Sequence, residues 1–242
     1  MGIHGVILDV DGTLLESNDA HARAWADAFA EFGVSAPFAL VRPLIGMGAD
    51  KLLPAVRPDL SKDAGVGKQI SQRAGEIFLA RYVQGLVPTP GARRLLDRMR
   101  TEGLRLVVAT SSKQGELDVL LRAANVADLV DGAVTASGIE HSKPNPSIVE
   151  QALARLNLHP ASALMLGDTP YDIEAAATAG VGTIALRCGG RTDAELAGAL
   201  AIYDHPADLL AHYDSSPLAG RDAPRADLEE GRAAPFADPS DA

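Results

Sequence analysis

Two carboxylates, Asp9 and Asp11, stand one residue apart where the apolar run of residues 3–8 gives way to a Gly-Thr pair. A buried carboxylate without a partner costs several kcal/mol or becomes protonated through a shift of its pKa. A pair at the end of a buried strand therefore indicates a bound cation or a catalytic task. The alternative is structural, because Asp and Gly also close strands in ordinary turns. Taken alone, the motif leaves both interpretations open.

A second apolar run ends in three hydroxyl groups and an amine, which belong to Thr110, Ser111, Ser112 and Lys113. A helix is expected to begin there, and a helix N-terminus presents free N–H groups that can bind an anion. Ser111 and Gln114 are also spaced as a capping box. By itself this segment favours the structural explanation, so it becomes informative only beside the other strand ends.

Charged side chains also follow two later apolar runs. Lys143 precedes Pro144, which disfavours helical geometry at the lysine, and the next helix is expected to begin two residues later. An exposed lysine is the ordinary alternative, but prolines hold this one on a rigid loop. Asp168 directly follows its run, and Asp172 lies in the first turn of the next predicted helix, where an acid is also a favourable partner of the helix dipole.

The elements that must position these residues alternate as in an α/β protein. Short apolar runs separated by amphipathic stretches indicate strands at residues 3–8, 104–110, 132–135, 163–167 and 183–186, with a weaker one near 201–203. This pattern predicts an open, parallel, Rossmann-like sheet of five to six strands with helices on both faces. Ligands of such sheets bind beyond the carboxyl ends of the strands. The polar segments are therefore expected to meet at one edge of the sheet.

The segment between the first two strands has a different pattern. From Asp19 to Gln84 apolar residues recur at helical spacing without a strand-like run, and the chain returns through a proline-rich linker at residues 87–91. We therefore expect a catalytic core of residues 1–15 and 88–213 and an inserted all-helical cap of residues 16–87. Residues 214–242, rich in Pro, Ala and acids, are expected to be a disordered or loosely docked tail.

The composition indicates a soluble enzyme. The 242 residues carry a net charge of -10 and no basic cluster, which argues against a nucleic-acid partner. No stretch approaches the ~18 apolar residues of a membrane helix, and no signal-peptide pattern opens the chain, so we expect no membrane partner and a cytoplasmic location. Cys188 is the only cysteine, which excludes an intramolecular disulfide. The sequence is compatible with a monomer or a homodimer.

The converging groups together indicate phosphoryl chemistry. Three or four neighbouring acids repel one another unless a hard cation lies among them, and Mg²⁺ suits sparse carboxylates that share it with phosphate and water. Lys143 and helix-mouth N–H groups would add the positive charge that phosphoryl transfer requires. No His or Cys is placed to attack. A carboxylate is therefore the expected nucleophile, forming an aspartyl-phosphate that water hydrolyses.

In combination, the motifs resemble the four ordered motifs of the haloacid dehalogenase-like phosphohydrolase superfamily, over residues 3 to about 213. The resemblance rests on Asp9-x-Asp11-Gly12-Thr13, Thr110, Lys143-Pro144 and Gly167-Asp168-x-x-x-Asp172. Each motif is weak alone, but the ordered set is highly specific. The presence of Asp11 also separates the chain from the dehalogenases, which lack an acid at that place.

The resemblance implies a role for each matching residue. Asp9 would be the nucleophile and a Mg²⁺ ligand, and Asp11 would offer its backbone oxygen to the metal and its side chain as general acid and then base. That proton role asks for a pKa nearer neutrality than a free Asp has. Asp168 would bind Mg²⁺ and Asp172 would support it, directly or through another ligand. The residues expected to hold the phosphoryl group are Gly12, Thr13, Thr110, Ser111 and Lys143.

The helical insert resembles the cap of the subfamily that includes phosphoglycolate phosphatases and beta-phosphoglucomutase. His21 and Trp25 match the start of that cap, where the histidine lies near the catalytic acid, although packing of both residues explains the motif equally well. Gly46 lies in a segment that resembles the loop closing over the substrate. The residues expected to contact the substrate are His21, Trp25, Gly46 and Lys51 from the insert and Ser112 and Lys113 from the second strand end.

Two departures from the mutase pattern favour a phosphatase. The mutase holds a second phosphate with a cap-loop arginine, whereas the aligned residue of this chain is Ala49. The mutase also carries Glu directly before the metal-binding Asp, whereas this chain has Gly167 there. We therefore expect a Mg²⁺-dependent phosphatase acting on a small phosphorylated metabolite, phosphoglycolate-like or a sugar monophosphate. A beta-phosphoglucomutase-like enzyme is the alternative. A non-catalytic phosphate-binding module is a third, disfavoured because such a descendant would be expected to lose Asp9 or Asp11.

Overall fold

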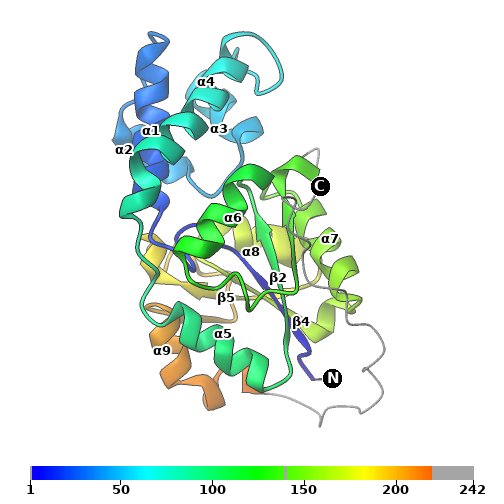
Figure 1. Cartoon of the computed structure of the whole chain (residues 1–242). Coiled ribbons are helices and arrows are strands. Elements are labelled where there is room, and N and C mark those ends of the chain that lie inside the picture. Colours follow the sequence, from blue (N-terminus) through cyan, green and yellow to red (C-terminus); the bar gives the residue numbers. More distant parts are fainter. Residues whose placement is uncertain (1, 139–140, 220–242) are drawn as a thin grey trace, which may run out of the picture.

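Six parallel strands form one open sheet in the computed structural model, which describes residues 2–138 and 141–219. The strand order is β3-β2-β1-β4-β5-β6 (Figure 1). The strands are β1 Gly5–Leu8, β2 Arg105–Thr110, β3 Gly132–Thr135, β4 Ala163–Gly167, β5 Gly182–Leu186 and β6 Ala201–Tyr203. The α/β class, the parallel sheet and the number of strands predicted from the sequence are confirmed.

The central strand, β1, brings its carboxyl end level with those of its two neighbours. Leu8 is in register with Val108 of β2 on one side and with Leu166 of β4 on the other. All four residues of β1 are buried, as expected for a parallel strand that is covered on both faces. Asp9 therefore emerges at the middle of the edge where ligands of such sheets bind.

Helices cover both faces of the sheet, and alternate residues of β1 face different layers. Val6 and Leu8 belong to a hydrophobic cluster that also contains Leu95 and Leu120, whereas Ile7 packs in a second cluster with Ile148. This division reflects the two-residue period of a strand. The helices of the sheet domain are α5 Ala92–Thr101, α6 Gln114–Ala123, α7 Ser147–Leu156, α8 Pro170–Thr178 and α9 Pro206–Ala211.

The segment between β1 and α5 is helical throughout the residues assigned to regular structure, and it stands above the sheet in Figure 1. It contains α1 Asn18–Glu31, α2 Phe38–Val41, α3 Ala49–Val56 and α4 Gly65–Ile77, followed by a π-helical turn at Phe78–Tyr82. Phe29 of α1 and Ile70 of α4 are fully buried in the same hydrophobic cluster. Phe32, directly after the last residue of α1, is exposed.

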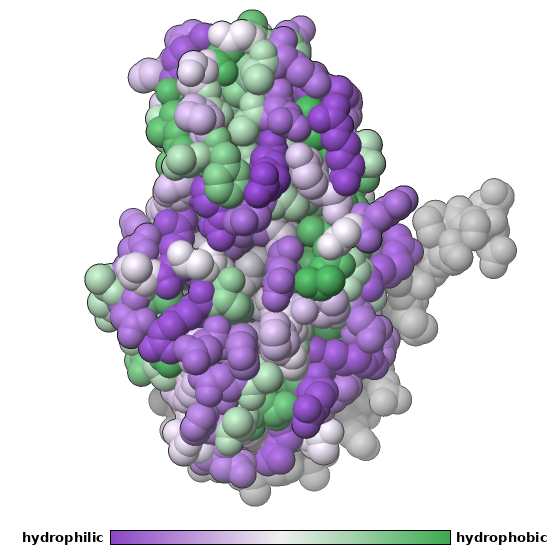
Figure 2. Space-filling model, turned by 90° about the vertical axis from the view of Figure 1, so that its left-hand side faces the viewer, coloured by the Kyte–Doolittle hydropathy of each residue, from purple (hydrophilic) through white to green (hydrophobic). Residues whose placement is uncertain are grey.

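The described start of the predicted tail packs against the sheet domain. Tyr213–Ser215 and Pro217–Ala219 form short 3₁₀ turns, and Leu218 is fully buried. The remainder of that segment, residues 220–242, lies outside the described residues. Over the described part of the chain, no helix is long and apolar enough to cross a membrane. On the face shown in Figure 2, apolar side chains are interspersed with polar ones over both the insert and the sheet domain.

Candidate active site

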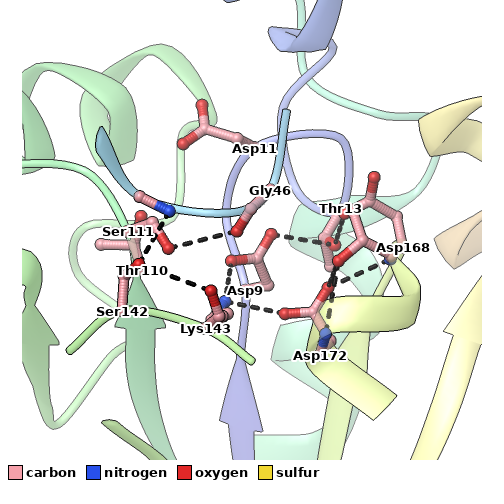
Figure 3. Close-up of polar contacts among 12 residues, drawn as sticks. Asp9, Asp11, Thr13, Gly46, Thr110, Ser111, Ser142, Lys143, Asp168 and Asp172 are labelled. Atoms are coloured by element: carbon pink, nitrogen blue, oxygen red, sulfur yellow. Dashed lines mark hydrogen bonds and ion pairs between the residues drawn. The ribbon is translucent and has the colours of Figure 1, made fainter. Parts of the chain in front are cut away.

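Lys143 holds together two acids that come from different strand ends (Figure 3). Its Nζ atom donates to Asp9 Oδ1 at 2.5 Å and forms an ion pair with Asp172 Oδ1 at 2.7 Å. The lysine side chain is only 1% exposed, and Asp9 is 6% exposed. An ammonium group buried this deeply needs charged partners. The solvated-lysine explanation of Lys143 is therefore excluded.

Asp168, at the end of β4, is oriented by two side chains from the loop after β1 and the start of α1. Thr13 Oγ1 donates to Asp168 Oδ1 at 2.9 Å, and Asn18 Nδ2 donates to Oδ2 at 2.8 Å. Sequence reasoning missed Asn18, which lies in the insert and outside every recognised motif. No sequence signal marked it, because the contact joins residues that lie 150 positions apart in the chain.

Asp172 combines a capping role with a place in the acid cluster. Its Oδ2 accepts hydrogen bonds from the backbone N–H and the hydroxyl of Thr169, at 3.0 and 2.6 Å, which completes a capping box at α8. Its Oδ1 faces Lys143. Asp172 thus stabilises the start of α8 through Oδ2 and belongs to the acid cluster through Oδ1.

The acid cluster fits a divalent cation. Asp9, Asp168 and Asp172 are all buried, and each offers a carboxylate oxygen within 4.8 Å of the others. The surrounding backbone leaves room for these groups only because glycines stand at Gly12 and Gly189, where an added Cβ would collide with Asp168 Oδ2. Oxygen donors of this kind suit Mg²⁺. The observation supports the metal site expected from the sequence.

Burial and mutual repulsion perturb the pKa values of this cluster. Burial raises the pKa of Asp9 well above its ordinary value; Lys143 opposes this effect, whereas the neighbouring carboxylates add to it. Burial and Asp172 raise the pKa of Asp168 to about 7, against the hydrogen bonds from Asn18 and Thr13. For Lys143, burial lowers the pKa, but the two acids it contacts raise it overall. One lysine is thus insufficient to neutralise three buried acids.

Asp11 is separated from this cluster, because its side chain points away from it in Figure 3. It accepts hydrogen bonds from Ser17 Oγ at 2.5 Å and Ser112 Oγ at 2.9 Å, and its Oδ1 lies 2.9 Å from His21 Nε2. Burial raises the pKa of Asp11, but His21 and the two hydroxyl groups outweigh burial and lower it to about 2. The prediction of a pKa nearer neutrality is wrong for this conformation because these partners stabilise the anion.

The second strand end does not form the expected capping box. Ser111 Oγ instead donates to the backbone oxygen of Gly46 at 3.2 Å, and Lys113 stands at the N-cap of α6. Thr110 is fully buried, and its Oγ1 accepts from the backbone N–H of Ser112 at 3.0 Å. The hydroxyl of Ser111 therefore links the sheet domain to the insert.

A second link between the insert and the sheet domain lies next to Lys143. Asp50 accepts from the Ser142 hydroxyl at 2.5 Å and from its backbone N–H at 3.2 Å, while Gly48 N–H donates to the same hydroxyl at 3.0 Å. Neither Asp50 nor Ser142 was identified from the sequence. Both are ordinary polar residues whose meeting depends on tertiary structure.

A cavity opens between the insert and the carboxyl edge of the sheet. Its lining includes Asp9, Asp11 and Ser111, together with most of the residues expected to contact the substrate: His21, Trp25, Gly46, Ser112 and Lys113. His21 also stacks on Phe78, with ring centroids 3.8 Å apart, so its packing and its place beside Asp11 coexist. Lys51, by contrast, is exposed and does not line the cavity. Its turn of α3 directs it elsewhere, which corrects the expected contact.

This arrangement of a parallel sheet, a buried acid cluster and a buried lysine defines a hydrolase of the phosphatase class. The chain belongs to the haloacid dehalogenase-like hydrolases, whose family model matches residues 3–180. The superfamily predicted from the ordered motifs is thereby confirmed.

Individual relatives point in the same direction. A phosphoglycolate phosphatase of Rhodospirillum rubrum is 31% identical over 215 residues, which cover 84% of this chain and 88% of that protein. The structure of a hydrolase from Pseudomonas syringae is similar with a TM-score of 0.81 and 26% identity, covering 88% of this chain and 98% of that one. The structure of CbbY from Rhodobacter sphaeroides in complex with phosphate gives a TM-score of 0.72 and 26% identity, covering 86% and 96%.

The glycine cradle leads to a prediction about Mg²⁺ binding. Gly189→Ala should weaken Mg²⁺ binding at least about tenfold, because the new methyl group would displace Asp168 from the acid cluster. Isothermal titration calorimetry of the variant and the wild type measures this directly. Gly85→Ala is the control, since a Cβ at Gly85 meets nothing within 4 Å. Equal affinity in Gly189→Ala and the wild type would show that Asp168 is not held as described.

The contact between His21 and Asp11 predicts a pH-dependent contribution to stability. Burial lowers the pKa of His21, but Asp11 raises it above 6.5 overall, so the contribution is complete below about pH 6.5 and is lost as pH rises through the folded-state pKa. The Asp11 contribution is present above about pH 4 and is lost as pH falls towards 2. Urea unfolding should therefore show that His21→Gln destabilises more at pH 5.5 than at pH 9. A loss of stability that is equal at both values would contradict this pairing.

Proposed function

We propose that this protein is a Mg²⁺-dependent phosphatase that hydrolyses a small phosphorylated metabolite, phosphoglycolate-like or a sugar monophosphate, through an aspartyl-phosphate on Asp9. One observation carries the proposal. Among the described residues, Asp9 alone belongs both to the buried acid cluster and to the lining of the cavity. A carboxylate in that position can meet a substrate phosphoryl group on one side and a metal ion on the other. The phosphatase relatives support the same activity.

The proposed first step is attack by an Asp9 carboxylate oxygen on phosphorus, which breaks the ester bond and releases an alcohol. Mg²⁺ held by Asp9, Asp168 and Asp172 would supply positive charge against the phosphoryl oxygens. Lys143 favours the ionised form of Asp9 and would provide a cation for the same oxygens. Ser111 and the fully buried Thr110 lie at the adjacent strand end, where their hydroxyl and N–H groups would complete the phosphoryl site.

In the second step, water attacks the phosphorus of the aspartyl-phosphate, which restores Asp9 and releases inorganic phosphate. The ionised Asp11 found in this conformation fits the acceptance of a proton from that water. Proton donation to the leaving group in the first step requires protonated Asp11. His21 and Ser112 oppose protonation of Asp11 in this conformation. Asp11 would therefore have to change its contacts between donating a proton in the first step and accepting one in the second.

We further propose that residues 16–87 act as a cap on a core of residues 1–15 and 88–213. Three contacts between the two parts support this: Ser111 with Gly46, Ser142 with Asp50, and Arg191 with the backbone oxygen of Pro43 at 2.5 Å. Closure of such a segment excludes water from the reacting phosphoryl group. In this proposal, the described conformation corresponds to the closed arrangement of the cap.

The mutase alternative is less well supported than a phosphatase. A mutase needs a second phosphate site, but Ala49 lines the cavity where the mutase pattern has arginine. Arg42 of the same loop is engaged elsewhere, with Asp19 at 2.6 Å and the backbone oxygen of Gly189 at 2.7 Å. If beta-glucose 1-phosphate with its bisphosphate yielded glucose 6-phosphate faster than inorganic phosphate, the mutase would be preferred.

The phosphatase proposal predicts Mg²⁺-dependent release of phosphate from p-nitrophenyl phosphate. Asp9→Asn should lower kcat at least about a thousandfold, because the amide cannot act as the nucleophile. EDTA should abolish wild-type turnover and added Mg²⁺ should restore it. Glu16→Gln, which removes a charge from an exposed position nearby, is the matched control and should retain wild-type rates. Comparable turnover by Asp9→Asn would instead favour a non-catalytic phosphate-binding module.

A further inference from the structure

The cavity contains a carboxylate to which neither the fold nor the proposed chemistry assigns a task. Glu116, in the first turn of α6, is half-buried and lines the cavity. Its side chain makes no hydrogen bond or ion pair with any described residue. A Cβ placed at Gly75 of α4 would lie 2.8 Å from Glu116 Oε1. The insert therefore approaches this carboxylate closely at Gly75, which has no side chain that could bond to it.

The groups around Glu116 leave its charge available to a ligand. Lys113 also lines the cavity, but it is exposed and makes no ion pair with Glu116. His21 is engaged by Asp11, which raises its pKa more than the charge of Glu116 does. Ser71 of α4 is buried in the lining, and its hydroxyl has no hydrogen-bond partner among the described residues.

The insert does not supply the cation that a second anionic group would need. Within the described lining, the insert contributes apolar or small residues, the Ser71 hydroxyl and a single basic residue, His21. Arg42 and Arg191, the nearby arginines of the two domains, are not part of this lining; Arg42 bonds to the backbone oxygen of Gly189, and Arg191 bonds to those of Pro43 and Ile45. Lys113, from the sheet domain, is the one cation of the described lining without an ion pair, so a second phosphate or carboxylate on the substrate would meet that exposed lysine and the negative charge of Glu116 together, with no arginine to offset the carboxylate.

An ionised carboxylate can only accept hydrogen bonds, and a bound substrate that covers Glu116 excludes water from it, which is unfavourable unless the substrate supplies a donor in its place. A substrate that brings a donor to this position removes that cost, whereas one that brings an anion increases it. We propose that Glu116 accepts a hydrogen bond from a hydroxyl or protonated amine of the leaving group, and so selects monophosphates of sugars and related polyols over phosphorylated carboxylic acids. This inference rests on the proposed phosphatase function and assigns its substrate class.

The test compares kcat/KM for three substrates in the wild type and in Glu116→Gln. Glucose 6-phosphate offers hydroxyl groups, glucosamine 6-phosphate adds a protonated amine, and phosphoglycolate offers a carboxylate. The wild type should favour the better sugar phosphate over phosphoglycolate at least tenfold. Glu116→Gln should lower this ratio about tenfold, since a hydrogen bond to a charged group becomes a neutral one. A preference of the wild type for the amine over the hydroxyl compound identifies which donor Glu116 binds.

Asp118→Asn is the matched control, because Asp118 is an exposed acid on the same helix. It should leave the ratio unchanged, and thermal unfolding of both variants checks that they fold. A ratio that Glu116→Gln does not lower, or a wild type that prefers phosphoglycolate, would overturn the inference. Failure of the wild type to hydrolyse p-nitrophenyl phosphate with Mg²⁺ would instead overturn the proposed phosphatase function, so the two failures are distinguishable.

Discussion

An excess of buried negative charge at the centre of the sheet edge is the constraint on which the rest of the site depends. Asp9, Asp168 and Asp172 bring carboxylate oxygens within 4.8 Å of one another. Among the described residues, Lys143 is the one buried cation of this cluster, and it pairs with Asp9 and Asp172. Such a cluster persists only where its acids are hydrogen-bonded and a further cation can bind. Thr13, Asn18 and Thr169 provide the hydrogen bonds. The parallel sheet provides the convergence, because register aligns the carboxyl ends of β1, β2 and β4.

Polar contacts join the insert to the same edge of the sheet. Asp50 reaches Ser142, the residue before the buried lysine, and Asn18 at the start of α1 reaches Asp168. A movement of the insert is therefore coupled to the segments that carry the charged groups. The cavity between the two parts is lined by Glu116, and under the proposed function this carboxylate would face the leaving group.

The strands and the acid cluster could be predicted because their signals are local. Apolar runs mark the buried strands, and the rule that parallel strands share one active edge brings Asp9, Lys143 and Asp168 together without any knowledge of the loops. Asn18, Asp50 and Glu116 could not be found in this way. Each is a common surface residue type. The partners of Asn18 and Asp50 lie 150 and 92 residues away in the chain, and Glu116 is distinguished only by its place in the cavity. The low pKa of Asp11 was missed for the same reason, since it depends on three side chains meeting around one carboxylate.

The claim that Asp168 contributes excess buried charge, balanced by a bound cation, is tested most directly by thermal unfolding of the wild type and Asp168→Asn, each in EDTA and in Mg²⁺. Without metal, Asp168→Asn should unfold at a higher temperature than the wild type, because removal of one carboxylate relieves the repulsion. Mg²⁺ should raise the unfolding temperature of the wild type by several degrees and leave that of the variant unchanged. A variant that is less stable than the wild type in EDTA, and equally stabilised by Mg²⁺, would contradict the account.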